Sequence, residues 1–192
     1  MTTIIITTKI KAPIETVFDI ARNIDIHQLS AANSNEKAID GKTSGLIELN
    51  ETVTWSGKHF GVNLLHKSRI TQFNFPTYFV DEMEEGHFKS FKHEHFFQTE
   101  NEHTIMIDRL EYKTPYGIFD FLFDKIILKK YLTNFIIHRN KILKNIAENP
   151  QLSITIPLHL TGFKNLSGVN QHQTPQNWHT FHPKRGVILI SF

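Results

Sequence analysis

The chain has 192 residues, which suits a single domain with room for one short additional segment. It contains no cysteine, so disulfide bonds, thiolate metal sites and a cysteine nucleophile are excluded. The formal net charge of +2 is too small to indicate a nucleic-acid-binding protein.

The first predicted elements are a strand and two short helices. Residues 4–11 alternate β-branched and polar side chains, which is typical of a strand with one wet face. A helix is expected to begin at Ala12-Pro13, because proline suits the first helical turn and Glu15 favours the positive end of the helix dipole. A second short helix is predicted over residues 26–32.

Six further strands and one long helix follow. The strands are predicted at residues 37–40, 46–57, 59–73, 77–84, 88–98 and 104–113. Their short connections favour an antiparallel meander. The sequence Thr114-Pro115-Tyr116-Gly117 breaks this pattern and precedes a helix over residues 118–148 that has a long apolar stripe.

This order of elements predicts an α+β protein of the helix-grip type. About seven curved antiparallel strands would wrap around the long C-terminal helix, with the two short helices after the first strand. The concave face of the sheet and the helix would then enclose a cavity. The 16 phenylalanines suit either an apolar cavity wall or a large solid core, and composition does not separate the two.

A change in composition predicts a boundary at Pro150. All 19 acidic residues precede it, whereas residues 150–192 contain three basic residues and no acidic one. We interpret residues 1–149 as the domain and residues 150–192 as an extension that is poorly ordered or not part of the fold. The alternative is an arm that covers the cavity.

Three stretches carry a resemblance to a known family. They are ETVTWSGKHFG at residues 51–61, FVDEMEEGHFKSFKHEHFF at 79–97 and MIDRLEYKTPYG at 106–117. Together with the order of elements, they resemble the START-like superfamily, also called SRPBCC or Bet v 1-like, and within it a bacterial branch whose members are labelled ligand-binding proteins or cell-division inhibitors. The resemblance implies a cavity for a hydrophobic ligand and supplies no catalytic residue.

Strand parity selects the side chains that face the cavity. Side chains alternate between the two faces of a strand, so the charged face marks the outside. In FKHEHFF this places Lys92 and Glu94 outside as a solvent-facing pair and His93 and His95 inside. In residues 59–73 the same parity places His66 inside and His59 outside, unless a bulge at a neighbouring glycine reverses it.

One basic residue falls on the apolar stripe of the long helix. A buried Arg139 needs a partner, because an unpaired charge in apolar surroundings is strongly unfavourable. An inward carboxylate or an anionic head group of a ligand would supply it. The full set of predicted ligand contacts is Glu51, Trp55, Asp81, Phe91, His93, His95, Asp108, Tyr112 and Arg139.

The paired histidines allow several functions. His93 and His95 can satisfy inward carboxylates, bind the polar end of a ligand, ligate a metal with an Asp or Glu, or move a proton with Asp108. We predict no metal and no cofactor, and a cytoplasmic protein that binds or carries a small hydrophobic molecule such as a lipid, quinone or polyketide. The alternatives are a cyclase, dehydratase or hydrolase that uses a His–Asp pair, and a regulatory protein that binds a protein partner.

Membrane contact is a further possibility raised by the sequence. No apolar run is long enough for a transmembrane segment. The apolar stretch IFDFLFDKIILKKYL at residues 118–132 suits either peripheral contact with a membrane or partner, or coverage by the loops around a cavity mouth.

Overall fold

A computed structural model describes residues 1–115 and 123–149, so the proposed extension at residues 150–192 lies outside the described residues. The elements are β1 (Thr2–Ile10), α1 (Ile14–Ala21), α2 (Ile24–Ser30), the 3-10 turn η1 (Ala32–Ser34), β2 (Lys37–Gly41), β3 (Thr52–His59), β4 (Val62–Asn74), β5 (Tyr78–Glu85), β6 (Ser90–Glu100), β7 (His103–Lys113), the π-helical segment η2 (Asp124–Leu128) and α4 (Lys129–Glu148).

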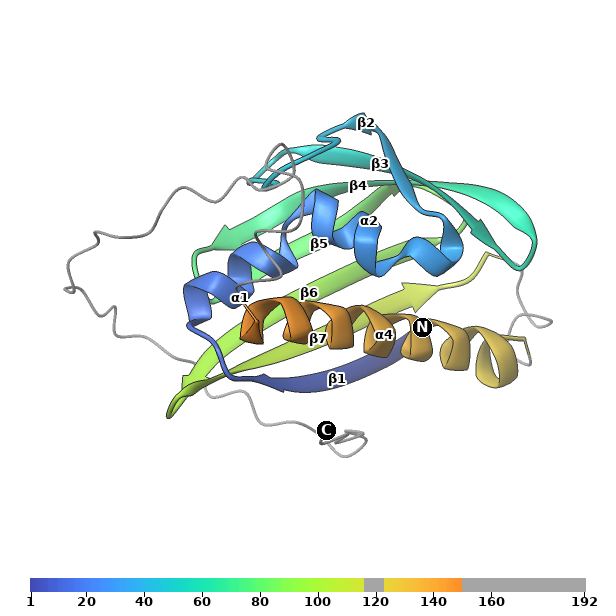
Figure 1. Ribbon diagram of the computed structural model, residues 1–192. Coiled ribbons are helices and arrows are strands. Elements are labelled where there is room, and N and C mark those ends of the chain that lie inside the picture. The colour runs from blue at the N-terminus through green and yellow to red at the C-terminus, as the bar shows by residue number, and fades with distance from the viewer. Residues whose placement is uncertain (116–122, 150–192) are drawn as a thin grey trace.

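The strands form one antiparallel sheet with helices on one face. The order across the sheet is β1-β7-β6-β5-β4-β3-β2, so β1 closes the meander by pairing with the last strand. Figure 1 shows the sheet curving around α4, with α1 and α2 on the same concave side. The predicted α+β helix-grip class is therefore confirmed, with seven strands and two short helices after the first strand.

The boundaries of two predicted strands are wrong in an informative way. We expected one strand to end at residue 57 and the next to begin at residue 59. Instead β3 continues to His59, and Phe60 and Gly61 form the tight turn of a hairpin. Both turn residues have positive φ values, of 51° and 82°. Such turns match the twist of the paired strands.

The hydrophobic interior consists of two clusters. In the first, the ring of Phe18 from α1 packs against those of Phe73, Phe75, Phe79 and Phe97, with centroids 5.1–5.3 Å apart. The second cluster joins β1 and β7 to the start of α4, and it contains Ile4, Ile6, Leu110, Tyr112, Leu128 and Ile136. Phenylalanine therefore builds the core beneath α1, whereas the second cluster is mainly aliphatic, with Tyr112 inside it and the partly buried Phe88 and Phe91 packed against it.

No helix among the described residues is both long and apolar enough to span a membrane.

Candidate functional site

A cavity of about 200 Å³ lies between the two hydrophobic clusters, under α2 and α4. One water molecule needs roughly 10–15 Å³, so this space is far larger than a packing defect. Its apolar wall includes Trp55, Ile70, Phe79, Phe91, Leu132 and Ile136. The phenylalanines within residues 1–115 and 123–149 therefore do not fill the space between sheet and helix.

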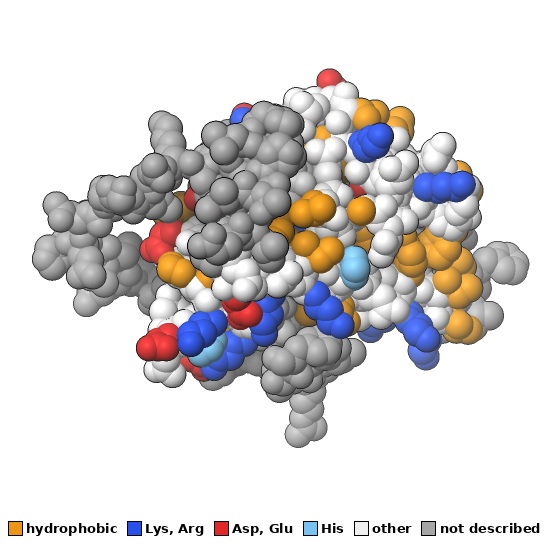
Figure 2. All heavy atoms as spheres, in the orientation of Figure 1, with side chains coloured by type: hydrophobic (Ala, Val, Ile, Leu, Met, Phe, Trp, Pro, Cys, Tyr) orange, Lys and Arg blue, Asp and Glu red, His pale blue; other side chains and the backbone are white. Residues whose placement is uncertain are grey.

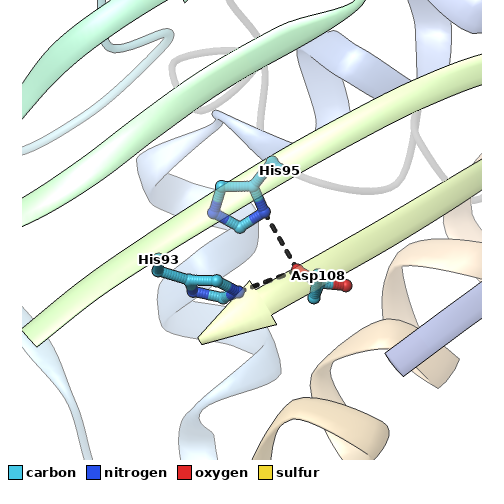
Figure 3. Close-up of side chains that lie close together, drawn as sticks. All are labelled: His93, His95 and Asp108. Atoms are coloured by element: carbon cyan, nitrogen blue, oxygen red, sulfur yellow. Dashed lines mark hydrogen bonds and ion pairs between the residues drawn. The ribbon is translucent and has the colours of Figure 1, made fainter. Parts of the chain in front are cut away.

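The first polar cluster of the cavity joins β6 to β7. His93 Nε2 lies 3.0 Å from Asp108 Oδ1, in hydrogen-bonding geometry. His95 Nδ1 lies 2.9 Å from the same oxygen, at an angle too poor for a full hydrogen bond. Figure 3 shows both rings reaching from β6 toward the carboxylate on β7. His95 and Asp108 are directly paired in the register of the two strands, and His93 is two residues along.

Two side chains of helix α4 complete this cluster. Arg139 Nη1 lies 3.6 Å from Asp108 Oδ1, and Asn140 Nδ2 donates to Asp108 Oδ2 at 2.7 Å. Arg139 also donates to the backbone oxygen of Ala21 at 2.9 Å. The guanidinium is thus anchored to α1 and to the sheet at the same time, as a buried charge requires.

Burial and hydrogen bonding set the protonation states of this cluster. Burial lowers the pKa of His95 to about 3, so this ring is neutral. Burial by itself raises the pKa of Asp108, but the adjacent imidazoles of His93 and His95 outweigh it and hold that pKa well below its usual value. Asp108 is therefore an ionised acceptor between two imidazoles.

These three residues also have the composition of a metal site. Among the described residues, His93, His95 and Asp108 form a group whose candidate ligand atoms all lie within 4.8 Å of one another. The guanidinium of Arg139 lies 3.6 Å from the same Asp108 oxygen and would repel a cation held there. The arrangement favours an ion-pair network over a metal centre.

A second polar cluster lies on another part of the cavity wall. Glu36, which follows η1, lies between two histidines: His27 Nε2 is 2.9 Å from Oε2, and His59 Nε2 is 3.2 Å from Oε1. Burial alone raises the pKa of Glu36, but the hydrogen bonds from His27 and His59 outweigh it and lower the pKa to about 2. The ring of His27 also stacks on Trp55, with centroids 4.1 Å apart.

A glycine makes room for this second cluster. A Cβ atom at Gly57 would lie 2.6 Å from Glu36 Cγ and 3.0 Å from His59 Nε2, which is too close for either. On the other side of the ring, His59 Nδ1 lies 2.6 Å from the hydroxyl of Tyr131 on α4. In the tautomer of His59 that donates from Nε2 to Glu36, Nδ1 accepts a hydrogen bond from the hydroxyl of Tyr131.

The structure brings six of the nine predicted contacts to the cavity. They are Trp55, Asp81, Phe91, His93, His95 and Arg139. Their role in binding a ligand stays a prediction.

The other three predicted contacts do not line the cavity. Glu51 precedes β3, and its carboxylate pairs with Lys42 at 3.1 Å and accepts from the backbone N–H of Glu48 instead of lining the cavity. Asp108 faces inward but lies behind the two histidines. Tyr112 is buried, and its hydroxyl donates to Asp124.

One further expectation from strand parity is wrong. His59 faces the cavity, since it belongs to β3 and shares the parity of Trp55. A second expectation holds for the face of the sheet and not for the exposure. Lys92 and Glu94 pair on the outer face as expected, but Glu94 is only 7% exposed, because Tyr78 donates to its carboxylate and Arg109 also pairs with it.

Sequence reasoning missed most of the second cluster. His27, Glu36 and Tyr131 come from a helix, a loop and the long helix, and no spacing in the sequence links them. The signal that was available is the hairpin turn at residues 60–61, which would have carried His59 onto the inner face.

The hairpin and the start of the long helix form an exposed apolar end. Phe60, Phe123, Ile126 and Ile127 are each more than 40% exposed, and the ring of Phe60 lies 5.9 Å from that of Phe123. Figure 2 shows hydrophobic side chains at this end of the molecule with blue Lys or Arg side chains beside them. Phe60 also contributes to the cavity wall, so this apolar end borders the cavity.

Comparison by sequence finds no relative. No protein-family model matches the chain, and no curated protein matches it. Solved structures do match. A START superfamily protein from Mycobacterium smegmatis is 12% identical, with a TM-score of 0.59, and the match covers 78% of this chain and 98% of that one.

Two others extend the comparison. Ginseng major latex-like protein 151 from Panax ginseng is 14% identical with a TM-score of 0.58, over 77% of this chain and 98% of that one. The Zhui aromatase/cyclase from a Streptomyces species is 11% identical with a TM-score of 0.62, over 77% and 93%. The chain has a START-like fold. At these identities the likeness concerns the fold alone, and the START-like cavity must be interpreted from its own residues.

Proposed function

We propose that this START-like protein binds and carries a small hydrophobic molecule, of lipid, quinone or polyketide type, in the cavity between the sheet and α4. The observation that carries the proposal is the cavity itself, about 200 Å³ with a mainly apolar wall and a few convergent polar groups. This combination is typical of small-molecule sites. The solved structures with the same fold include the Zhui aromatase/cyclase, and an aromatic or cyclic ligand of this kind would suit the apolar wall.

The polar contacts proposed for the ligand are Asp81, His93, His95 and Arg139, with Trp55 and Phe91 as apolar contacts. All six line the cavity. Asp108 acts indirectly, because it holds the rings of His93 and His95 in place. Glu36, His27, His59 and Tyr131 add a second polar region that a ligand of sufficient length would reach.

Native mass spectrometry of the protein purified from its own host tests this proposal. We expect a retained species of a few hundred daltons that is extracted by organic solvent and is absent after denaturation. A chain that retains nothing, and that also fails to bind an apolar fluorescent dye, would contradict the proposal. Capture of a protein partner in the absence of a ligand would favour the regulatory alternative.

The second candidate is an enzyme that moves a proton on the same ligand. The supporting observation is the hydrogen bond of 3.0 Å between His93 and Asp108, which resembles the orientation of a general base by a carboxylate. The test compares small molecules retained by the wild-type chain and by His93→Asn. Turnover would be established if the two chains retain different molecules and the molecule held by the variant is a precursor of the one held by the wild type. The same molecule in both would support carriage.

A further inference from the structure

The charged groups of the cavity are paired with one exception. Arg22 contacts Asp19 at 2.8 Å and Glu48 at 2.6 Å, and Arg139 pairs with Asp108. Glu36 is held by two histidines. The exception is Asp81 on β5, which makes no hydrogen bond or ion pair within residues 1–115 and 123–149. Arg139 and His66 act on it electrostatically without contacting it.

The position of Asp81 makes this lack of partners significant. It pairs with His93 across β5 and β6, and it lines the cavity. Its Oδ1 atom is shielded from solvent and has no hydrogen-bond partner. A buried acceptor without a partner destabilises a fold, and it does so more strongly when it carries a charge. Asp81 therefore calls for a donor that the described chain does not supply.

A neighbouring histidine presents an acceptor as well. A carboxylate oxygen attracts the protonated nitrogen of an imidazole, and His95 Nδ1 lies 2.9 Å from Asp108 Oδ1. In the neutral ring of His95 the opposite nitrogen, Nε2, then carries a lone pair. Figure 3 shows this atom directed away from Asp108, and His95 lines the cavity.

Arg139 does not make this part of the cavity a site for anions. Its charge is matched by Asp108, and two of its N–H groups are used by Ala21 and Asn140. Within residues 1–115 and 123–149, no free counter-charge lines the cavity to compensate the repulsion between Asp81 and a carboxylate ligand.

We propose that this part of the cavity recognises a hydrogen-bond donor on the ligand, either a hydroxyl or a protonated amine, with Asp81 as the principal acceptor. This inference rests on the proposed function and narrows its ligand class. An amphiphile with an anionic head group is disfavoured, although Arg139 lines the same cavity.

A competition experiment with matched head groups tests the inference. The fluorescent dye N-phenyl-1-naphthylamine would be bound to the wild-type chain at neutral pH and displaced by decylamine, decanol or decanoate, which share one alkyl chain. We expect decylamine and decanol to displace the dye at a concentration at least about tenfold lower than decanoate does, which corresponds to about 1.4 kcal/mol. Equal or stronger displacement by decanoate would overturn the inference.

Two variants assign the preference to Asp81. In Asp81→Asn, decylamine should lose about tenfold in affinity relative to decanol, because the amide keeps the shape and removes the charge. The control is Asp40→Asn, an exposed position on β2, which should leave the order of the three compounds unchanged. An unchanged amine preference in a folded Asp81→Asn chain would also overturn the inference. Failure of the wild-type chain to bind the dye would instead contradict the proposed function.

Discussion

Arg139 on α4 and Asp108 on β7 form an ion pair that is almost completely shielded from solvent. The two side chains are 6% and 0% exposed, and Arg139 Nη1 lies 3.6 Å from Asp108 Oδ1. Through this pair the long helix is fixed to the sheet at the back of the cavity. The same carboxylate orients His93 and His95 and accepts from Asn140, so one buried acid connects three elements of the fold.

Truncation of the arginine should therefore destabilise the fold strongly. We expect Arg139→Ala to lower the free energy of unfolding by about 3–5 kcal/mol, because the charge of Asp108 stays buried without its partner. Chemical denaturation measures the loss. In the control Lys9→Ala, which breaks the exposed pair with Glu100, the loss should stay below about 1 kcal/mol. Equal losses in the two variants would show that the buried ion pair contributes no more to the free energy of unfolding than the exposed one does.

Stability should fall as the pH is lowered from about 6.5. The pKa of His95 is about 3 in the folded chain, where burial beside His93 and Arg139 disfavours its charge and Asp108 only partly opposes this. Below about pH 6.5 the imidazole of His95 binds a proton in the unfolded chain, whereas in the folded chain it stays neutral down to much lower pH. The unfolded state therefore binds more protons, and acid favours unfolding. The slope should reach about 1.4 kcal/mol per pH unit for this proton.

Urea denaturation between about pH 6.5 and 5.5 measures this slope, above the range in which most carboxylates of an unfolded chain titrate. His95→Gln should flatten it, whereas His103→Gln, in a residue at the start of β7, should not. His66 contributes in the same direction, since burial lowers its pKa despite the opposing charge of Asp81. A slope that is identical in wild type and His95→Gln would refute the assignment to His95.

Gly57 and Glu36 should be energetically coupled. In Gly57→Ala the new methyl group would meet Glu36 Cγ at 2.6 Å, so the carboxylate must move away from His59. We expect a loss of about 1–3 kcal/mol, typical of overpacking. The double variant with Glu36→Gln should be more stable than the sum of the two losses predicts, by more than about 0.5 kcal/mol. Strict additivity in this double-mutant cycle would mean that the glycine has another role.

A larger side chain in the cavity should block an apolar ligand. Leu132 on α4 lines the cavity, and Leu132→Trp would fill part of its volume of about 200 Å³. We expect dye affinity to fall at least about tenfold while the fold is kept. Leu29→Trp is the matched control, because Leu29 on α2 is 49% exposed and does not line the cavity. Unchanged dye binding by Leu132→Trp would place the dye elsewhere.

The local patterns of the sequence were sufficient for the fold and for one wall of the site. Alternation in β6 and β7 placed His93, His95 and Asp108 on the inner face, and the position of Arg139 on an apolar helical stripe implied a buried partner. These inferences succeeded because strand and helix periods are local, so the residues of one element determine which side chains share a face.

Tertiary structure alone decided the rest of the cavity. The cluster of His27, Glu36, His59 and Tyr131 joins a helix, a loop, a strand and the long helix, and only the closure of the fold brings them together. Glu51 and the exposure of Glu94 differ from expectation because neighbouring groups bind both carboxylates. The sequence by itself determined the inward faces of β6, β7 and α4. The distances between elements, the pairing of the described cavity charges other than Asp81, and the open space itself depend on how the sheet curves around α4.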